Sequence, residues 1–327
     1  MVITRTPFRI SFFGGGSDYP TWFNQHSGAV LSATINKYCY ISCRYLPPFF
    51  EHTSRVVWSK IESVKGVDEI QHPVVRHALQ WLGISEGLEI HHNADLPARA
   101  GLGSSSSFTV GFLNALQALQ GRLSTKYQLA LDAIHVEQEL LKENVGCQDQ
   151  TAAAFGGLNK IEFGGMEQVK VSPMVCSRER LKELESHLLL YFTGMSRTAS
   201  EIAAEQIANI PDKEREIREM VRFVDEAVTI LHSLQWADQF GKLLHETWLL
   251  KKTLSSKIAN PLINSLYEEA RSAGALGGKL LGAGGGGFML FFAKPENHPA
   301  IKQRLANFLH VPFEFETSGS QIIYHAN

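Results

Sequence analysis

Residues 97–119 join a glycine- and serine-rich turn to a long apolar run, and this junction constrains the fold more than any other feature of the sequence. The turn contains Gly101-Leu-Gly103 and continues into four consecutive serines at 104–107, and the apolar run behind them has the spacing of a helix. The first turn of a helix carries backbone N–H groups without partners, so small residues placed before it form an anion site. An ordinary N-cap needs only one serine. Four serines behind two glycines therefore favour a phosphate-binding loop.

Charge and hydropathy limit the classes of partner. The 327 residues carry 31 Lys and Arg against 33 Asp and Glu, a net charge of -2, which argues against nucleic acid and against an anionic membrane surface as partners. No run approaches the roughly 20 apolar residues of a membrane span, and the first residues do not have the pattern of a signal peptide. The four cysteines lack the spacing of a zinc site or a disulfide scaffold. We therefore expect a cytoplasmic protein with reduced thiols.

The order of the expected elements indicates an α+β fold. Strands and turns predominate before residue 70, with a long strand at 29–45, and a helix is expected at 125–143. In the second half we expect helices at 199–209, 212–234, 236–254 and 261–272, then strands at 276–281, 288–292 and 321–324. Helices grouped apart from strands, without a regular βα repeat, are typical of α+β proteins. The pattern loosens between about 165 and 185, so we expect two domains, 1–175 and 176–327.

Two familiar nucleotide motifs fail on their context. Gly282-x-Gly284-x-x-Gly287 has the glycine spacing of a dinucleotide fingerprint, but a β-prone run follows it where that motif requires a helix. A Walker P-loop is absent, because Leu280 follows Lys279 where a magnesium-binding hydroxyl belongs. The sequence therefore argues against a nicotinamide dehydrogenase and against a Walker-type ATPase.

Two carboxylates lie on either side of a glycine-containing break at 144–148. Glu137 falls in the helix expected at 125–143, and Asp149 follows the break. An enzyme that uses a magnesium nucleotide needs one carboxylate to hold the metal and another to orient or deprotonate the attacking hydroxyl. Glu139 and Glu143 are equally acidic, and most helix glutamates are merely solvated. The pair therefore indicates this chemistry only together with other motifs.

The N-terminal run brings Arg9, the glycine turn at 14–16 and Asp18 close together in an apolar setting. A guanidinium near Asp149 would keep that carboxylate ionised, and Asp18 could accept hydrogen bonds from the hydroxyls of a polyol. A structural Arg9–Asp18 pair that pins the turn explains this segment equally well when it is taken alone.

Three motifs together resemble those of the GHMP kinases, a family named for galactokinase, homoserine kinase, mevalonate kinase and phosphomevalonate kinase. In chain order they are Arg9-x8-Asp18-Tyr19, Pro97-x3-Gly101-Leu-Gly103-Ser-Ser and Lys279-Leu-Leu-Gly-Ala-Gly-Gly-Gly-Gly-Phe288. The resemblance implies a two-domain architecture, with a ribosomal S5 domain 2-like N-terminal domain and a ferredoxin-like C-terminal domain. It also implies ATP and Mg²⁺ as cofactors.

The same resemblance assigns roles to matching residues. Ser105 and Glu137 match the magnesium ligands, Asp149 matches the catalytic aspartate of galactokinase-like members, and Arg9 matches its basic neighbour. The nucleotide is expected on Pro97, Gly101, Leu102, Gly103, Ser104, Ser105, Ser106 and Ser107. The substrate is expected on Gly16, Ser17, Asp18, Arg197, Lys279, Gly284 and Gly285.

Within the family, the N-terminal run is most similar to that of enzymes that act on D-glycero-D-manno-heptose 7-phosphate. The resemblance implies phosphorylation of the anomeric hydroxyl by ATP, giving the 1,7-bisphosphate for nucleotide-activated heptose and surface polysaccharide. Galactokinases have Glu-His where this chain has Gly15-Gly16, which argues against galactose. A fucokinase-like or other sugar-1-kinase and a non-catalytic sugar or nucleotide sensor are the alternatives. The sequence leaves the oligomeric state open, a homodimer included.

Overall fold

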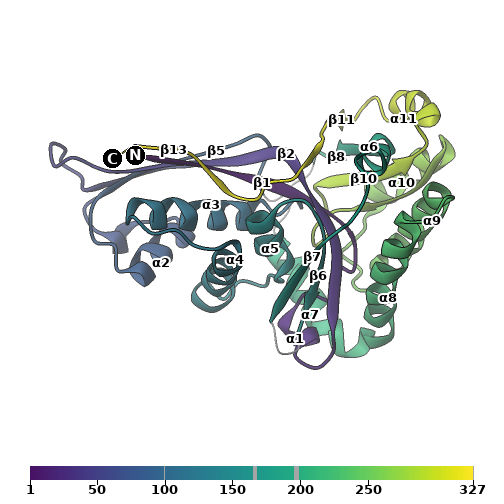
Figure 1. Cartoon of the computed structure of the whole chain (residues 1–327), viewed down its shortest axis with the longest axis horizontal. Helices are drawn as coiled ribbons and strands as arrows, with labels where there is room; N and C mark the ends of the chain where they lie inside the picture. Colours follow the sequence, from purple (N-terminus) through teal and green to yellow (C-terminus); the bar gives the residue numbers. More distant parts are fainter. Residues whose placement is uncertain (99, 165–167, 195–198, 327) are drawn as a thin grey trace.

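Two long antiparallel strands form the spine of the molecule. The structure is a computed structural model that describes residues 1–98, 100–164, 168–194 and 199–326. Strands β1 (Val2–Phe13) and β2 (Gly28–Tyr45) pair within a nine-stranded sheet, and both termini lie at one end of it (Figure 1). The other strands of this sheet are β3 (Ser54–Val57), β4 (Ile61–Val64), β5 (Leu88–Ala94), β6 (Leu158–Phe163), β7 (Val169–Pro173), β12 (Phe315–Glu316) and β13 (Gln321–His325).

The burial pattern of β2 shows how the sheet is covered. Residues 28–35 are all buried, whereas beyond them Cys39, Ile41 and Cys43 alternate with more exposed neighbours. The sheet is therefore enclosed on both faces near the start of β2 and on one face near its end. Cys39 and Cys43 are free thiols that pack in the core on the inner face.

Helices cover one face of the large sheet (Figure 1). They are α2 (Pro73–Leu82), α3 (Ser104–Leu119), α4 (Lys126–Ile134) and α5 (Gln148–Phe155); the short α1 (Pro20–Phe23) and a 3₁₀ turn (Val67–Glu69) lie in the connections. Helix α3 is buried along nearly its whole length, as a core helix with an apolar sequence should be. The helix expected at 125–143 is interrupted, because α4 passes into a π-helical turn (His135–Leu140) that carries Glu137.

A four-stranded antiparallel sheet forms the second part of the molecule, in the order β11-β8-β10-β9. Its strands are β8 (Leu188–Phe192), β9 (Ala275–Leu280), β10 (Phe288–Ala293) and β11 (Leu309–His310). Its helices are α6 (Arg178–Ser186), α7 (Ala199–Asn209), α8 (Glu214–Leu231), α9 (Trp236–Lys252), α10 (Pro261–Ser272) and α11 (His298–Arg304), with 3₁₀ turns at Ile210–Lys213 and Pro295–Asn297. The four long helices predicted from the sequence are confirmed as α7 to α10, and so is the α+β class.

The end of the chain returns to the first sheet. Strand β12 pairs with β2, and β13 pairs with β1. Both strands follow the boundary expected near residue 175, so the large sheet contains the two ends of the sequence. The apolar pattern of 321–324 predicts a strand, but strand pairing over this sequence distance depends on the whole fold.

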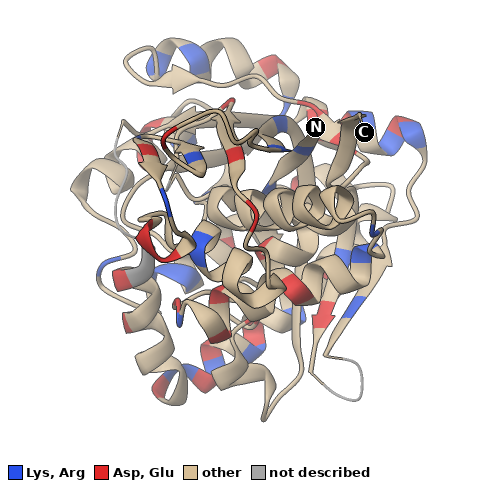
Figure 2. Cartoon of the chain, turned by 90° about the vertical axis from the view of Figure 1, so that its left-hand side faces the viewer, with Lys and Arg blue, Asp and Glu red and all other residues tan. Residues whose placement is uncertain are grey.

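Lys and Arg are interspersed with Asp and Glu over the elements seen in Figure 2. Many pair at helical spacing, as Arg222 does with Glu219 and Glu226 on α8. These charges solvate the outer face of that helix. Within the described ranges, no helix has the length and apolarity required to span a bilayer.

Candidate active site

A cavity of about 850 Å³ brings the three motifs together. Its polar lining comes from both parts of the molecule and includes Arg9, Ser11, Asp18, Tyr19, Ser59, Lys60, Ser104, Ser105, Glu143, Asn144, Gln148, Asp149, Gln206, Lys251 and Lys279. Its apolar and aromatic lining includes Phe8, Trp58, His72, Pro73, Val74, His92 and Phe108. Segments that are far apart in the sequence therefore face one space.

An ion pair between Arg9 and Asp149 lies at the centre of the polar lining. Arg9 Nε and Nη2 donate to the two carboxylate oxygens of Asp149, both at 2.7 Å, and Nη1 donates to Gly101 O at 2.8 Å. Arg9 is buried, whereas the side chain of Asp149 is 24% exposed and so is reachable from the cavity. The expected proximity of these two residues is confirmed. The alternative interpretation, an Arg9–Asp18 pair, is wrong because the guanidinium is committed to Asp149 and Gly101.

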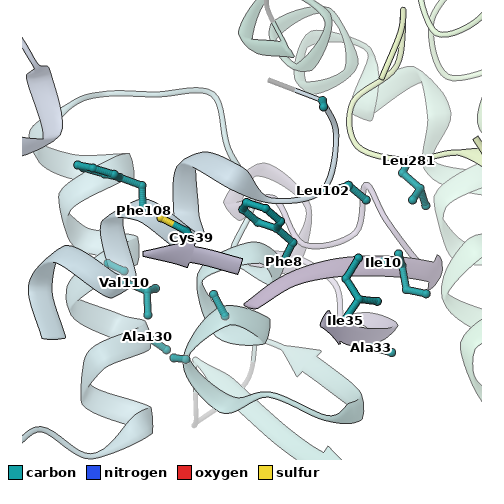
Figure 3. Packing of buried hydrophobic residues seen from close by; sticks show 14 of the residues in the cluster. Phe8, Ile10, Ala33, Ile35, Cys39, Leu102, Phe108, Val110, Ala130 and Leu281 are labelled. Carbon is teal, nitrogen blue, oxygen red and sulfur yellow. The ribbon is translucent and has the colours of Figure 1, made fainter. Parts of the chain in front are cut away.

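The glycine loop positions the N-terminus of α3 beside this ion pair. Gly101 and Gly103 have φ of +82° and +75°, in the left-handed region that favours glycine. A Cβ at Gly103 would crowd both Arg9 Cγ and Asp149 Oδ2 at 3.3 Å. Between the glycines, Leu102 is buried in the core, where Figure 3 shows it near Ile10, and its carbonyl accepts the backbone N–H of Arg9 at 3.1 Å. The burial of Leu102 and its hydrogen bond to Arg9 therefore fix the position of the loop at 101–103.

The four serines of α3 divide into two pairs. Ser104 and Ser105 line the cavity, whereas Ser106 and Ser107 are buried. Ser106 Oγ donates to Glu137 Oε2 at 2.8 Å, and Ser107 Oγ donates to Pro7 O at 2.9 Å. Only the first pair faces the cavity. Pro97, also expected to bind nucleotide, is exposed and lies outside the cavity lining, next to its lining neighbours Leu96 and Ala98.

Glu137 is buried in a network of neutral donors. Its carboxylate accepts from Ser106 at 2.8 Å, from Thr109 Oγ1 at 2.7 Å and from Gln150 Nε2. Burial raises the pKa of Glu137 to about 7, against the opposing effect of the hydrogen bonds. In the described part of the chain Ser105 makes no hydrogen bond to Glu137; their expected role as magnesium ligands stays a prediction. Successive helical residues are rotated by about 100°, which turns Ser105 to the cavity and Ser106 to the glutamate.

Asp18 is buried at the edge of the cavity. Its Oδ1 accepts the Gly16 N–H at 3.0 Å, and its Oδ2 accepts the Gln148 N–H at 3.4 Å. Burial raises the pKa of Asp18, the Gly16 N–H opposes this, and the charge of Asp149 adds to the rise. Asp18 and Gly16 both line the cavity, where the sequence predicts substrate.

Ser17, between them, holds the turn instead. It is fully buried, and its hydroxyl lies within hydrogen-bond distance of Gly14 O and of both the N–H and the carbonyl of Ala29 on β2. The expected contact of Ser17 with substrate does not fit this placement, because the hydroxyl is fully buried and both donates to and accepts from the backbone.

The C-terminal glycine loop at 282–287 packs against the glycine loop at 101–103. It joins β9 to β10, two antiparallel neighbours, so it has no helix behind it and is not a dinucleotide site. A Cβ at Gly282 would lie 2.5 Å from Gly101 Cα, and Gly282 lines the cavity together with Ala283. The two glycine loops thus pack backbone against backbone.

Gly284 and Gly285, expected at the substrate, face the other way. The Gly285 N–H donates to Ile258 O at 2.9 Å, and a Cβ at Gly284 would lie 2.8 Å from Ile258 Cα. Both are buried and neither lines the cavity. Their small size serves packing against the segment before α10.

Two lysines complete the polar lining. Lys279 of β9, predicted from the sequence, donates from Nζ to Phe12 O at 2.9 Å. Lys251 of α9 was not predicted, although it continues the buried stripe of Leu244 and Trp248 at helical spacing, a signal that marks a lysine facing inward. The other basic residue expected at the substrate, Arg197, lies outside the described residues.

An aromatic cluster that the sequence analysis did not identify lines the cavity. The ring of His72 lies 4.7 Å from Trp58 and 4.6 Å from Phe108, and His92 lies 4.9 Å from Phe108. Burial lowers the pKa of His72 to about 4, so its ring is neutral at pH 7. These residues come from separate segments of the chain, two connections, strand β5 and helix α3, so no local motif reveals them.

Family models match both parts of the chain. The model of the GHMP kinases N terminal domain matches residues 69–157, which contain the glycine loop, Glu137 and Asp149. The model of the GHMP kinases C terminal domain matches residues 230–311, which contain Lys251 and the second glycine loop. The residues that the structure brings together therefore lie mostly within segments shared by this family.

Two relatives illustrate the range of substrates in similar proteins. A D-glycero-alpha-D-manno-heptose 7-phosphate kinase of Campylobacter jejuni is 31% identical over 89% of this chain and 89% of its own length. A bifunctional fucokinase/GDP-fucose pyrophosphorylase of Arabidopsis thaliana is 28% identical over 91% of this chain, which spans 30% of that protein.

Solved structures have the same fold. A D-glycero-D-manno-heptose 1-phosphate kinase from Bacteroides thetaiotaomicron superposes with a TM-score of 0.82 at 24% identity, covering 100% of both chains. The galactokinase of Lactococcus lactis superposes with a TM-score of 0.77 at 17% identity, covering 98% of this chain and 94% of that one. The family models, the chain-long similarity and the fold agree: the chain belongs to the GHMP kinases, a family of ATP-dependent phosphotransferases.

Proposed function

We propose that the chain transfers the γ-phosphoryl group of ATP to the anomeric hydroxyl of D-glycero-D-manno-heptose 7-phosphate, forming the 1,7-bisphosphate. The observation that carries the proposal is the Arg9–Asp149 pair at the N-terminus of α3, in a cavity that also contains Asp18. The similarity to a heptose 7-phosphate kinase supports the choice of sugar. The domains of this enzyme would be 1–175 and 176–327, apart from the two strands that return to the first sheet.

ATP fits the cavity with its phosphates at α3 and its base among the aromatic side chains. The hydroxyls of Ser104 and Ser105 and the N-terminus of α3 provide donors and a favourable dipole for phosphate oxygens. Trp58, His72 and Phe108 offer apolar, flat surfaces to a heteroaromatic base. The neutral ring of His72 avoids placing a charge in this apolar subsite.

The donor chemistry near α3 suits Mg²⁺. Ser105 presents its hydroxyl oxygen to the cavity, and the oxygen atoms of Ser106 and Glu137 are buried behind it, outside the lining. Mg²⁺ is commonly held by one or two carboxylates together with substrate phosphates. No cluster of three His, Cys, Asp or Glu side chains among the described residues could hold a metal by itself, so phosphate oxygens would complete the coordination. When bound, the ion would neutralise charge on the β- and γ-phosphates.

Asp149 accepts or orients the proton of the attacking sugar hydroxyl in this proposal. Arg9 holds both oxygens of the carboxylate and so fixes its orientation toward the cavity. An anomeric hydroxyl is more acidic than an ordinary alcohol, so a carboxylate of modest basicity suffices. Asp18 receives hydrogen bonds from the other sugar hydroxyls, and phosphoryl transfer is direct and in line.

The screen that tests the proposal measures coupled ADP release over a panel of sugars and sugar phosphates. The panel contains heptose 7-phosphate, the unphosphorylated heptose, fucose, galactose and mannose 6-phosphate. We expect the highest kcat/KM for the heptose 7-phosphate. Faster turnover of fucose would favour the fucokinase-like alternative, and binding of ATP and sugar without ADP release would favour a sensor.

A further inference from the structure

Lys251 and Lys279 are two buried lysine side chains on one wall of the cavity. They are 7% and 2% exposed, and both line the cavity. Lys251 Nζ donates to the carbonyls of Leu280 and Gly282, and Lys279 Nζ donates to the carbonyl of Phe12. Among the residues that the structure describes, neither lysine has a carboxylate as an ion-pair partner. Buried ammonium groups are costly unless paired, so an anion bound at this wall would stabilise the protonated form of both lysines.

The charges around this wall leave a positive excess. The groups that act electrostatically on Lys279 are Lys251, Arg9 and Asp18. Because Arg9 is already paired with Asp149, the two lysines share a single carboxylate, that of Asp18. An ammonium group has three N–H donors, of which Lys251 uses two and Lys279 one on carbonyl oxygens. The remaining donors are available to a ligand.

A third side chain points to the same ligand chemistry. Ser11 is 5% exposed and lines the cavity, and its hydroxyl has no hydrogen-bond partner. Ser11 precedes Phe12, whose carbonyl accepts from Lys279, so the hydroxyl and the ammonium group come from neighbouring positions. A buried hydroxyl without a partner costs free energy that a polar ligand would recover.

We propose that Lys251, Lys279 and Ser11 form the subsite for the phosphate group that the sugar already carries before transfer. This inference rests on the proposed function. A phosphate monoester dianion supplies the missing charge and accepts several hydrogen bonds from ammonium and hydroxyl donors. The subsite begins at Ser11 and Phe12, about 7–10 Å along β1 from Arg9 at the rise of a strand, and ends at Lys251, which donates to Gly282 O beside the glycine loop at 101–103.

Burial has a consequence for the pH dependence of binding. Burial, together with the charge of Arg9 and against the opposing charge of Asp18, lowers the pKa of Lys251 to about 7. Burial also lowers the pKa of Lys279, and Lys251 and Arg9 add to the effect. A bound dianion would raise both pKa values, so binding above pH 7 takes up protons. A sugar phosphate stays dianionic there, because its second pKa is about 6.

The mutational test compares Lys251→Met with Lys252→Met. Lys252 is the next residue on α9, lies outside the cavity lining and places its ammonium group over Trp248. We expect Lys251→Met to raise KM for the heptose 7-phosphate about tenfold or more, since charge-assisted hydrogen bonds are lost. KM for ATP and the activity on unphosphorylated heptose should stay within about twofold, and Lys252→Met should change neither. An increase in KM for ATP alone would assign the lysine to a nucleotide phosphate and overturn the inference.

A second test uses the wild-type protein and so does not depend on whether a variant folds. KM for the heptose 7-phosphate should rise from pH 7 to pH 9, whereas the activity on the unphosphorylated heptose should not follow this trend. Calorimetry in two buffers of different ionisation enthalpy should show proton uptake on binding of the 7-phosphate at pH 8. If the 7-phosphate is turned over but shows no proton uptake and Lys251→Met leaves its KM unchanged, the subsite is wrong while the proposed function stands. If no sugar phosphate supports ADP release, the proposed function itself fails.

Discussion

Gly146 packs directly against Asp18, so closely that a Cβ at position 146 would overlap Asp18 Oδ2. The following residue strengthens the contact, because the Cys147 N–H donates to Asp18 O at 3.0 Å. The loop that contains Gly146 leads into α5 and Asp149. The absence of a side chain at one position therefore couples the N-terminal turn to the helix that carries the proposed base.

Gly146→Ala should displace Asp18 and weaken sugar binding. We expect KM for the sugar to rise about tenfold or more while the affinity for ATP stays within a few-fold, because the α3 loop does not contact this position. Steady-state kinetics with each substrate varied in turn measures the split. Gly66→Ala is the matched control, since the nearest atom to its Cβ would be Glu69 Oε1 at 3.6 Å. An unchanged KM for the sugar would show that Asp18 is not needed for binding.

Asp149→Asn should abolish turnover and leave nucleotide binding in place. The substitution keeps the size of the side chain and removes its charge, and a proton-accepting group contributes about 10²–10⁴ to the rate. ADP release measures kcat, and calorimetry measures ATP affinity. Asp225→Asn, on an exposed residue that pairs with Lys160, is the control and should be silent. Activity of the Asp149 variant within about tenfold of wild type would exclude its role as a base.

Ser106→Ala and Glu137→Gln should be coupled in their effects on the free energy of unfolding. Their side chains share a buried hydrogen bond of 2.8 Å, and contacting residues in one network show coupling of about 0.5–3 kcal/mol. Ser107→Ala is the control, because its hydroxyl donates to Pro7 O and its effect should add to that of Glu137→Gln. Repeating the cycle with Ser105→Ala on the Mg²⁺ requirement tells which serine acts with Glu137 on the metal. Additivity in the Ser106 cycle would contradict the network.

Glu137 should make stability decrease as pH rises. Burial raises its pKa to about 7, while in the unfolded chain a glutamate titrates near 4.3. Between these values the folded state binds more protons, so this contribution is complete below about pH 4.3 and is lost as pH rises toward 7. The difference in unfolding free energy between wild type and Glu137→Gln, measured by urea titration, should fall by a few kcal/mol over this range. A flat or rising difference would be the contrary result.

Trp58→Ala should weaken the binding of ATP without affecting the binding of the sugar. Removing an aromatic surface that stacks on a base costs about 1–3 kcal/mol, which appears as a higher KM for ATP. Trp81, which contacts His135 and lies outside the cavity lining, offers the control Trp81→Ala. Equal effects of the two substitutions on ATP would remove Trp58 from the nucleotide subsite.

The sequence by itself determined many of the helices and strands and the proximity of the main motifs. Helices α7 to α10 and the strand β2 follow from hydrophobic periodicity, and the loop before α3 follows from Gly101, Gly103 and the serines behind them. The proximity of Arg9 to Asp149 also follows, through the family resemblance of the motifs that contain them. These features are predictable because periodicity and glycine conformation are properties of short segments.

Only the tertiary structure decided which side of each segment faces the ligand. Ser106 rather than Ser105 hydrogen-bonds to Glu137. The hydroxyl of Ser17 accepts a hydrogen bond from the backbone of β2, and Lys251 of α9 lines the cavity. One residue along a helix changes the direction of a side chain by about 100°, and one residue along a strand reverses it. Which of these side chains faces the cavity depends on the segment that packs against it, and that segment belongs to a distant part of the chain. The pairing of β13 with β1 likewise depends on tertiary packing, because the two strands lie at opposite ends of the sequence.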